Sequence, residues 1–288
     1  MKSKLILVTV TYCPDSIELK QCLYSIFKYN DIGDRLKVIV VDNSPVDQSI
    51  IPSFSKQFNT VQFISAPENK GFGYSNNLGA NSVDSDYILF FNNDTELIQP
   101  IFKELIQRMN ADSSVGCSSI KQADNSQSFF EFPECSLTYF SKRIRQKFDL
   151  YNESDFYLSG AFMFFRRDAF KQCGQFDEGL FMYCEEPDIC NRLKRCGYHL
   201  AYHKDLSFVH KIGNRHVHSP QTYEQNAISL TYYLKKYHLE HLAKRILFSN
   251  VIRWEIKSFI YSVLNEKAIA RNIRYGIKVY KQNLNGFL

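Results

Sequence analysis

The sequence predicts an α/β protein built on a mostly parallel sheet that is flanked by helices. Runs of β-branched and aromatic residues alternate with helix-like stretches through the first half of the chain. Several of these runs are almost continuously apolar, which is typical of parallel strands that are covered on both faces. Short polar residues follow two of the runs. Ligands of open α/β sheets bind at the carboxyl ends of the strands, so a binding site is expected there.

The expected elements follow in order along the chain. Asp15 or Ser16 supplies the N-cap of a first helix that ends near residue 29. Strands are expected at residues 5–11, 36–41, 61–65 and 87–91, with further helices at 49–58 and 75–80. Residues 112–153 have no regular pattern, and we expect a variable loop region over the site. A strand at 158–165, helices at 166–173 and 187–196, and a last strand at 200–210 complete the sheet region.

The charge pattern divides the chain of 288 residues into two parts. The pattern from residue 221 onward is helical and basic. Between Lys235 and Lys281 there are eleven Lys or Arg and three Glu, a net charge of +8, whereas the whole chain carries +5. We therefore expect a sheet-containing domain at residues 1–220 and a basic helical C-terminal extension at 221–288.

The cysteine pattern and the N-terminus favour a cytoplasmic protein. None of the eight cysteines forms a C-x-x-C pair, so we expect reduced thiols rather than a zinc ribbon or a disulfide scaffold. The apolar run at residues 5–10 is too short for the core of a signal peptide, and no window is long enough to span a membrane.

Polar side chains end the second and fourth expected strands. Asp42 follows one strand and residues 92–94 follow the other. The carboxyl ends of parallel strands meet at one edge of a sheet, which favours a shared site. Loop capping by short polar residues is the alternative for each residue taken alone.

Five motifs in order resemble those of the family 2 glycosyltransferases, and most closely the bacterial rhamnosyltransferase-like branch. They are VVDNS at 40–44, NKGFGYSNN at 69–77, FNND at 91–94, GLFMYCEEPD at 179–188, and His210. The resemblance covers about residues 4–240. It implies a GT-A fold, which is Rossmann-like with a mostly parallel central sheet, a nucleotide-diphosphate-sugar donor, a divalent cation and inversion at the anomeric carbon.

The resemblance implies a nucleotide-binding side. Its expected residues are Thr11, Asp42, Asn69, Gly71, Gly73, Asn77 and Asn93. Asp42 would accept hydrogen bonds from the base or ribose, the alternative being a helix cap. Gly71 and Gly73 permit positive φ and close approach of the backbone to a ligand. Backbone N–H groups near a helix start also suit phosphate.

The resemblance places a metal site at residues 92–94, where the family has a D-x-D motif. Asn92 replaces the first acid, so Asp94 is the expected ligand of Mg²⁺ or Mn²⁺, and His210 completes the site. The cation would neutralise the leaving diphosphate, although the neutral Asn92 predicts weaker binding of the ion. His203, His216 and His218 remain alternatives to His210.

The resemblance identifies Glu186 as the base that takes the proton of the acceptor hydroxyl. Glu185 and Asp188 are its rivals, since Glu186 stands where the family has Asp. The same residues also fit the acidic first turn of a helix, in which Arg192 would pair with Asp188. Upstream, Ser159 and Gly160 match the family's acceptor-side segment, where the glycine would leave room for a sugar.

The basic extension suggests a membrane or a protein partner. An amphipathic basic helix lies well at an anionic surface, which suits a lipid-linked acceptor at the inner face of the plasma membrane. Alternatively, the extension packs on the catalytic domain or on a second copy of the chain in a homo-oligomer. No nucleic-acid-binding motif accompanies the charge, so nucleic acid is not expected as a partner.

The leading hypothesis is therefore an inverting glycosyltransferase of cell-surface polysaccharide biosynthesis. It would move rhamnose or a hexose from a dTDP- or UDP-linked donor to a hydroxyl of a glycan or lipid-linked oligosaccharide. A non-catalytic nucleotide-binding partner subunit is an alternative, because Asn92 and Glu186 depart from the family pattern. A nucleotidyltransferase would need a glycine-rich basic loop after the first strand, which residues 12–15 do not provide.

Overall fold

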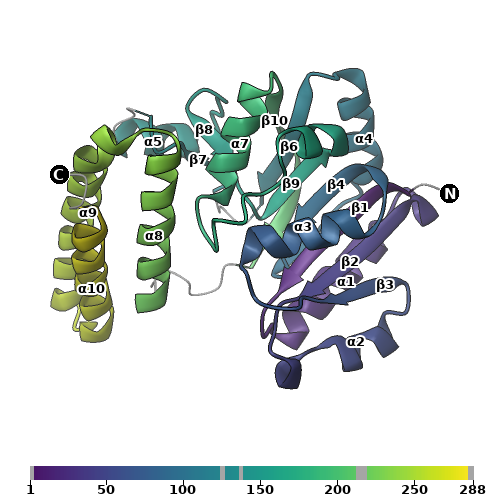
Figure 1. Ribbon diagram of the computed structural model, residues 1–288, viewed down its shortest axis with the longest axis horizontal. Coiled ribbons are helices and arrows are strands. Elements are labelled where there is room, and N and C mark those ends of the chain that lie inside the picture. Colours follow the sequence, from purple (N-terminus) through teal and green to yellow (C-terminus); the bar gives the residue numbers. More distant parts are fainter. Residues whose placement is uncertain (1–2, 124–126, 136–138, 212–218, 285–288) are drawn as a thin grey trace. The chain divides into compact units, whose positions relative to one another are not determined.

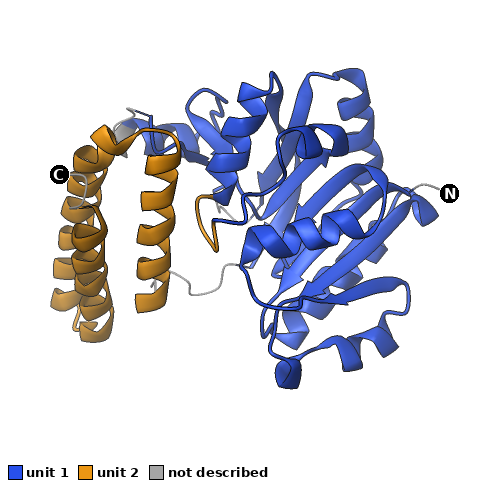
Figure 2. Cartoon of the chain, viewed as in Figure 1, with its two compact units in different colours: residues 1–179, 185–212 blue, residues 180–184, 213–288 orange. Residues whose placement is uncertain are grey.

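The computed structural model describes residues 3–123, 127–135, 139–211 and 219–284. The chain forms two compact units (Figure 2). Unit 1 comprises residues 1–179 and 185–212, and unit 2 comprises residues 180–184 and 213–288. The short segment 180–184 therefore belongs with the C-terminal helices, although it lies in the middle of the sequence of unit 1.

Unit 1 is built on an eight-stranded sheet of order β3-β2-β1-β4-β9-β6-β10-β5 (Figure 1). Its strands are β1 (Ser3–Thr11), β2 (Leu36–Asp42), β3 (Val61–Ser65), β4 (Ser85–Phe91), β5 (Thr95–Leu97), β6 (Val115–Gln122), β9 (Phe162–Arg166) and β10 (His199–His210). Strands β1 to β4 pair in parallel, as do β6 and β10. Strand β9 is antiparallel to β4 and β6, and β5 is antiparallel to β10. The predicted mostly parallel α/β sheet is confirmed.

Helices cover both faces of this sheet. One buried cluster includes side chains of α1 (Ser16–Lys28), α2 (Ile51–Gln57) and α4 (Phe102–Ala111). The other includes α3 (Phe72–Ser82), α6 (Arg167–Gln172) and α7 (Glu185–Arg195). Asp15 caps α1 as expected, since its carboxylate accepts hydrogen bonds from the backbone of Ile17 and Glu18. Helix α5 (Tyr139–Lys147) and a two-stranded sheet, β7 (Phe129–Glu131) with β8 (Phe156–Leu158), complete the unit.

Two expectations for this region were wrong. Residues 112–153 are not simply a loop region, because β6 lies inside the sheet between β9 and β10. Ser119 is accommodated there by a hydrogen bond from its Oγ to the carbonyl of Phe162 at 2.8 Å. The single strand expected at 158–165 is instead divided. Strand β8 ends at Leu158 and β9 begins at Phe162, with the Ser159–Gly160 turn between them.

Unit 2 contains α8 (Pro220–Lys236), α9 (Ala243–Val263) and α10 (Lys267–Leu284) around a core of its own. The ring of Trp254 stands edge-on to Tyr223 and Tyr280, with centroids 5.3 and 4.6 Å away. Ser229 Oγ of α8 donates to the carbonyl of Met182 at 2.7 Å, which ties segment 180–184 to these helices. None of the helices that the structure describes is long and apolar enough to cross a membrane.

Candidate active site

The end of β2 is organised by the carboxylate of Asp42, which is only 1% exposed. One oxygen accepts hydrogen bonds from Thr11 Oγ1 (3.2 Å) and the backbone N–H of Ser44 (3.0 Å). The other accepts from Ser49 Oγ (2.7 Å) and the N–H of Ile50 (3.1 Å). Asp42 therefore fixes the loop after β2 against the end of β1, as in the capping alternative, and its contact with a nucleotide stays a prediction.

Asn69 joins this strand end to the glycine loop. Its Oδ1 accepts hydrogen bonds from Asn43 Nδ2 and from the N–H of Gly71, both at 3.1 Å. Gly71 has φ +97° directly before α3, so a residue with a side chain would be strained there. The structure thus brings the predicted nucleotide-side residues Asp42, Asn69 and Gly71 into one connected set of loops.

Two other residues expected on the nucleotide side make contacts within the protein. The expectation of positive φ was wrong for Gly73, which is helical; a Cβ at this position would lie 3.0 Å from Phe176 Cβ. Asn77 exchanges hydrogen bonds with the backbone of Phe176 (2.9 and 3.0 Å) and donates to Glu178 Oε1 (3.1 Å). Gly73 and Asn77 therefore hold the segment before residue 180 against α3.

Strand pairing brings Asp94 and His210 together. Asp94 occupies the turn between β4 and β5, and the antiparallel register of β5 with β10 sets Thr95 opposite His210. As a result, His210 Nε2 lies 3.3 Å from Asp94 Oδ1, with side chains 13% and 3% exposed. Asn93 is partly exposed beside Asp94 in the same turn.

Gln122 orients the His210 ring. The Nε2 amide of Gln122 donates to the carbonyl of Gln127 (2.9 Å) and to Ser159 Oγ (3.3 Å), so its Oε1 is the atom that faces His210 Nδ1 at 3.1 Å. An acceptor there places the ring proton on Nδ1 and leaves the lone pair of Nε2 directed toward Asp94. A carboxylate oxygen and an imidazole nitrogen held in this way fit a divalent cation.

The other histidines do not join Asp94 in the described structure. His203 lies on β10 opposite Ile120, where burial, and then the charge of Arg108, lower its pKa. His216 and His218 lie outside the described residues. His210 is therefore the histidine that the described structure places beside Asp94.

The segment after β8 links this pair to the acidic start of α7. Ser159 contacts Gln122, and the N–H of Asn92 donates to the carbonyl of Ala161 at 3.2 Å. Between them, a Cβ on Gly160 would lie 2.7 Å from Glu186 Oε1. The room that Gly160 leaves is thus filled by this carboxylate. One continuous chain of contacts therefore runs from Asp94 through His210, Gln122 and the turn at 159–161 to Glu186.

The three acidic residues of α7 have different environments. Asp188 is fully buried and paired with Arg192 at 2.6 Å, which confirms that predicted ion pair. Burial, followed by the charge of Glu186, raises the pKa of Glu185 well above its usual value. Burial also raises the pKa of Glu186, but its own backbone N–H, and then that of Gly160, stabilise its charged form. Glu186 is therefore the group that can alternate between carboxylate and acid beside the turn.

Sequence reasoning missed Gln122, because β6 was not recognised as a strand. The residue ends that strand, and a polar residue at the end of a sheet strand was the signal that identified Asp42 and Asp94. Its burial of 98%, with one amide contacting both His210 and Ser159, comes only from the fold.

The fold is a GT-A fold, which the chain shares with glycosyltransferases of known structure. The chain belongs to glycosyl transferase family 2, whose profile matches residues 8–174.

The comparisons with individual proteins agree with this class. Rhamnosyltransferase WbbL of Escherichia coli (strain K12) is 26% identical over 262 residues, which are 84% of this chain and 87% of that protein. N-acetylglucosaminyl-diphospho-decaprenol L-rhamnosyltransferase of Mycobacterium tuberculosis (strain ATCC 25618 / H37Rv) is 41% identical over 54 residues, 19% of this chain and 18% of that protein. Mannosyltransferase PcManGT from Pyrobaculum calidifontis, solved with GDP-Man and Mn²⁺, has the same fold at 16% identity, with a TM-score of 0.60 over 99% of this chain and 75% of that chain.

Proposed function

We propose that this chain transfers rhamnose, with inversion, from a nucleotide-diphosphate donor to a hydroxyl of a lipid-linked glycan during cell-surface polysaccharide biosynthesis. The names of the two rhamnosyltransferase relatives support the sugar, and the second supports an acceptor on a lipid diphosphate. The observation that carries the proposal is the continuous contact from Asp94 and His210 through Gln122 and Gly160 to Glu186.

Glu186 is the base in this proposal. The acceptor oxygen forms a bond to the anomeric carbon while the bond from that carbon to the diphosphate oxygen breaks, and Glu186 takes the hydroxyl proton. A raised pKa brings the carboxylate nearer to neutral pH, where a base works best. The backbone N–H groups of Glu186 and Gly160 favour the carboxylate form. The other two acidic residues are less suitable as the base. Asp188 forms an ion pair with Arg192, and burial favours the neutral acid at Glu185.

Asp94 and His210 would hold the divalent cation, which would supply positive charge to the diphosphate of the donor. Among the described residues, no group of three His, Cys, Asp or Glu side chains is close enough to bind a metal. With Asp94 and His210 as its protein ligands, the cation would take diphosphate oxygens and water at its other positions. The imidazole ligand favours Mn²⁺ over Mg²⁺, which prefers oxygen ligands.

Unit 2 would hold the enzyme at the cytoplasmic face of an anionic membrane. One face of α9 carries exposed apolar side chains three or four residues apart: Phe248, Ile252, Ile256, Phe259 and Val263. The opposite face is buried through Trp254 and Ser258. Exposed Lys244 and Lys257 on the same helix match the charge of anionic lipids.

The proposal predicts different effects for the two adjacent glutamates. Glu186→Gln should lower transfer about 10²- to 10⁴-fold, the usual contribution of a positioned base, and leave donor binding intact. Glu185→Gln is the matched control and should retain transfer. The measurement is release of nucleoside diphosphate from dTDP-rhamnose and from UDP-hexoses, with Mn²⁺ and a short-chain prenyl-diphospho-N-acetylglucosamine. Full activity in Glu186→Gln would remove Glu186 from the base role.

A further inference from the structure

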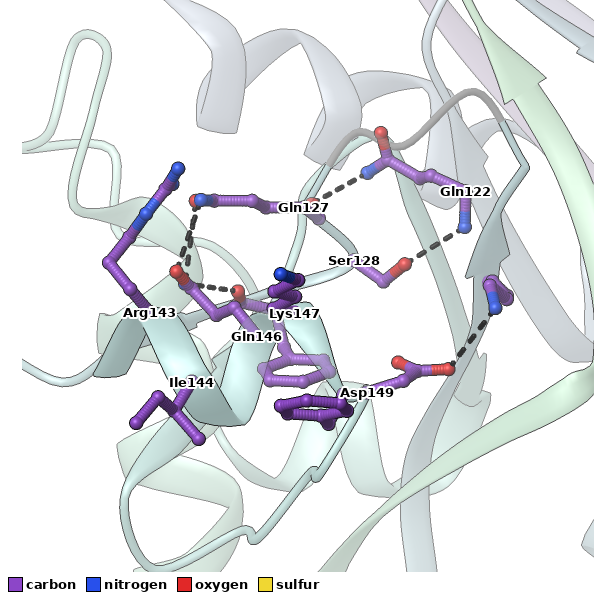
Figure 3. Close-up of a pocket in the computed structure, with 11 residues that line it drawn as sticks. Gln122, Gln127, Ser128, Arg143, Ile144, Gln146, Lys147 and Asp149 are labelled. Atoms are coloured by element: carbon purple, nitrogen blue, oxygen red, sulfur yellow. Dashed lines mark hydrogen bonds and ion pairs between the residues drawn. The ribbon is translucent and has the colours of Figure 1, made fainter. Parts of the chain in front are cut away.

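A cavity of about 570 Å³ lies beside the candidate active site in unit 1 (Figure 3). It is lined by the end of β6, the residues that lead into β7, helix α5 and the two residues after that helix. The amides of Gln127 and Gln146 meet within it at 3.1 Å, with Arg143 and Lys147 alongside (Figure 3). Neither the proposed base nor the metal pair lines this cavity.

The cavity is positively charged. Its lining includes three cations, Lys121, Arg143 and Lys147, and one carboxylate, Asp149. That carboxylate is already engaged, since Tyr202 donates to it at 2.7 Å and Lys121 lies 3.6 Å from it. Arg143 and Lys147 are one turn apart on α5, and neither has an acidic partner in the part of the chain that the structure describes. Two adjacent cations of this kind suit a polyanion such as a diphosphate.

An apolar strip runs next to these cations. Ile144 and Phe148 are also one turn apart, each directly following a cation in sequence, and their side chains are 37% and 64% exposed. Both line the same cavity as Arg143 and Lys147. A ligand that satisfied the whole lining would therefore combine a multiply charged anion with a hydrocarbon chain.

Two polar residues of the lining connect the cavity to the active site. Gln122 contacts His210 Nδ1 at 3.1 Å and Ser159 Oγ at 3.3 Å. The carbonyl of Ser128 accepts the N–H of Ser159 at 3.0 Å, one residue before the glycine that contacts Glu186. A ligand in the cavity would thus lie one layer of side chains away from both the metal pair and the turn beside the base.

We infer that this cavity binds the diphosphate and the first part of the hydrocarbon chain of a lipid-linked acceptor, an assignment that rests on the proposed function. Lys121, Arg143 and Lys147 contact the diphosphate, and Ile144 and Phe148 contact the chain. A diphosphate also occurs in the sugar donor. In the proposed function, the donor diphosphate lies at the cation held by Asp94 and His210, and neither of these residues lines the cavity. The cavity is therefore assigned to the acceptor diphosphate.

The charge requirement is tested by binding of geranyl diphosphate, a short lipid diphosphate, to the full chain. Arg143→Gln with Lys147→Gln should weaken its binding at least tenfold, as expected for the loss of hydrogen bonds to a charged group. Lys37→Gln with Lys56→Gln removes the same charge from exposed positions on β2 and α2 and should leave binding unchanged. Equal binding by wild type and the Arg143/Lys147 variant would overturn the inference.

Two further binding experiments test whether the hydrocarbon chain contributes to binding and whether the diphosphate is that of the acceptor or of the donor. Ile144→Ser with Phe148→Ser should weaken geranyl diphosphate but leave the weaker binding of inorganic diphosphate unchanged. Inorganic diphosphate binding wild type as tightly as geranyl diphosphate would rule out a lipid ligand. UDP and dTDP with Mn²⁺ should bind the Arg143/Lys147 variant as they bind wild type, and a parallel loss would assign the cations to the donor instead.

The results of these experiments distinguish an error in the binding site from an error in the proposed function. If no sugar nucleotide supports transfer but geranyl diphosphate still needs Arg143 and Lys147, the proposed reaction is wrong and the binding site stands. If transfer occurs but the Arg143/Lys147 variant keeps the wild-type KM for the prenyl-diphospho acceptor, the reaction stands and the binding site is wrong.

Discussion

Glu185 and Glu186 are adjacent, identical side chains in different environments, and the proposed function gives them different roles. Glu185 is 5% exposed, and one of its carboxyl oxygens has no hydrogen-bond partner in the described structure. Glu186 lies beside the Gly160 N–H, which favours its ionised form. Burial, and then the charge of Glu186, raise the pKa of Glu185 well above its usual value, so we expect the proton on Glu185 and the charge on Glu186.

This division predicts two different pH effects. Both pKa values lie above the usual 4.5, so the folded protein binds more protons than the unfolded chain above that pH. Its free energy of unfolding should therefore fall as pH rises through the raised values. Glu185→Gln should reduce this fall, because its amide cannot ionise. The acid limb of kcat/KM should stay in place, because Glu185 is already neutral while Glu186 ionises.

The two pH effects are measured by a pH–rate profile and by chemical unfolding at several pH values, for wild type and for Glu185→Gln. Transfer should rise with pH as Glu186 loses its proton, in wild type and in Glu185→Gln alike. An acid limb that moves to lower pH in the variant would show that the two carboxylates share one proton, and would contradict the assignment.

Helix α3 depends on a close approach to the sheet at Gly79. A Cβ there would lie 2.5 Å from Val8 Cγ1 and 3.0 Å from Val41 Cγ2. Gly79→Ala should lower the free energy of unfolding by about 1–3 kcal/mol through overpacking, a cost that better helix propensity offsets only in part. Because Gly71, in the predicted nucleotide loop, is the N-cap of α3, UDP binding should weaken as well.

Thermal unfolding and UDP titration would check this effect of α3. Asn81→Ala, at an exposed position of the same helix, removes only the two side-chain hydrogen bonds with Gln175 (3.1 and 2.8 Å) and should change both quantities less than Gly79→Ala does. A Gly79→Ala protein as stable as wild type would mean that α3 has room to move away from β1 and β2.

The elements that the sequence predicted well have strong apolar runs. Strands β1, β2 and β4 are almost entirely buried, and their β-branched and aromatic residues identify them. Strand β6 carries Gly116, Ser118 and Ser119 instead, and it is held by pairing with β9 and β10, which are distant in sequence. Strand β5 has only three residues. Long-range pairing of this kind leaves no local signal.

The sequence predicted the site residues that belong to the five motifs. It did not predict the contacts between residues that are distant in sequence. The placement of Asp94 beside His210 follows from the register of β5 with β10, which the motifs anticipated without showing its cause. The contact of Gly160 with Glu186 and the bridging amide of Gln122 join residues 26 or more positions apart in sequence. Such contacts depend on how β8, β9 and α7 meet, and one sequence does not contain that information.

At the scale of the whole molecule, two separate segments of the chain, 180–184 and 213–288, make up unit 2. Segment 180–184 joins the C-terminal helices through the bond from Ser229 to Met182, and Glu185 follows it directly. The helices therefore hold the residues that immediately precede the proposed base.

The exposed face of α9 predicts binding to anionic membranes. Ile256 and Phe259 are 56% and 69% exposed on that face, and Glu there would bring charge to the lipid boundary. Ile256→Glu with Phe259→Glu should abolish cosedimentation with phosphatidylglycerol vesicles. Wild type should bind these vesicles less as salt rises, and should bind phosphatidylcholine weakly, since its basic residues contribute by long-range attraction.

The control for this experiment is Ile17→Glu with Val46→Glu, which introduces the same charge at positions 66% and 91% exposed in unit 1. It should bind vesicles as wild type does, apart from a small uniform loss from its charge. Sedimentation equilibrium of the same proteins tests the alternative that a second copy of the chain covers the exposed face of α9. If the α9 variant converts a dimer to a monomer while wild type ignores vesicles, the apolar face joins two copies of the chain, and the membrane proposal is wrong.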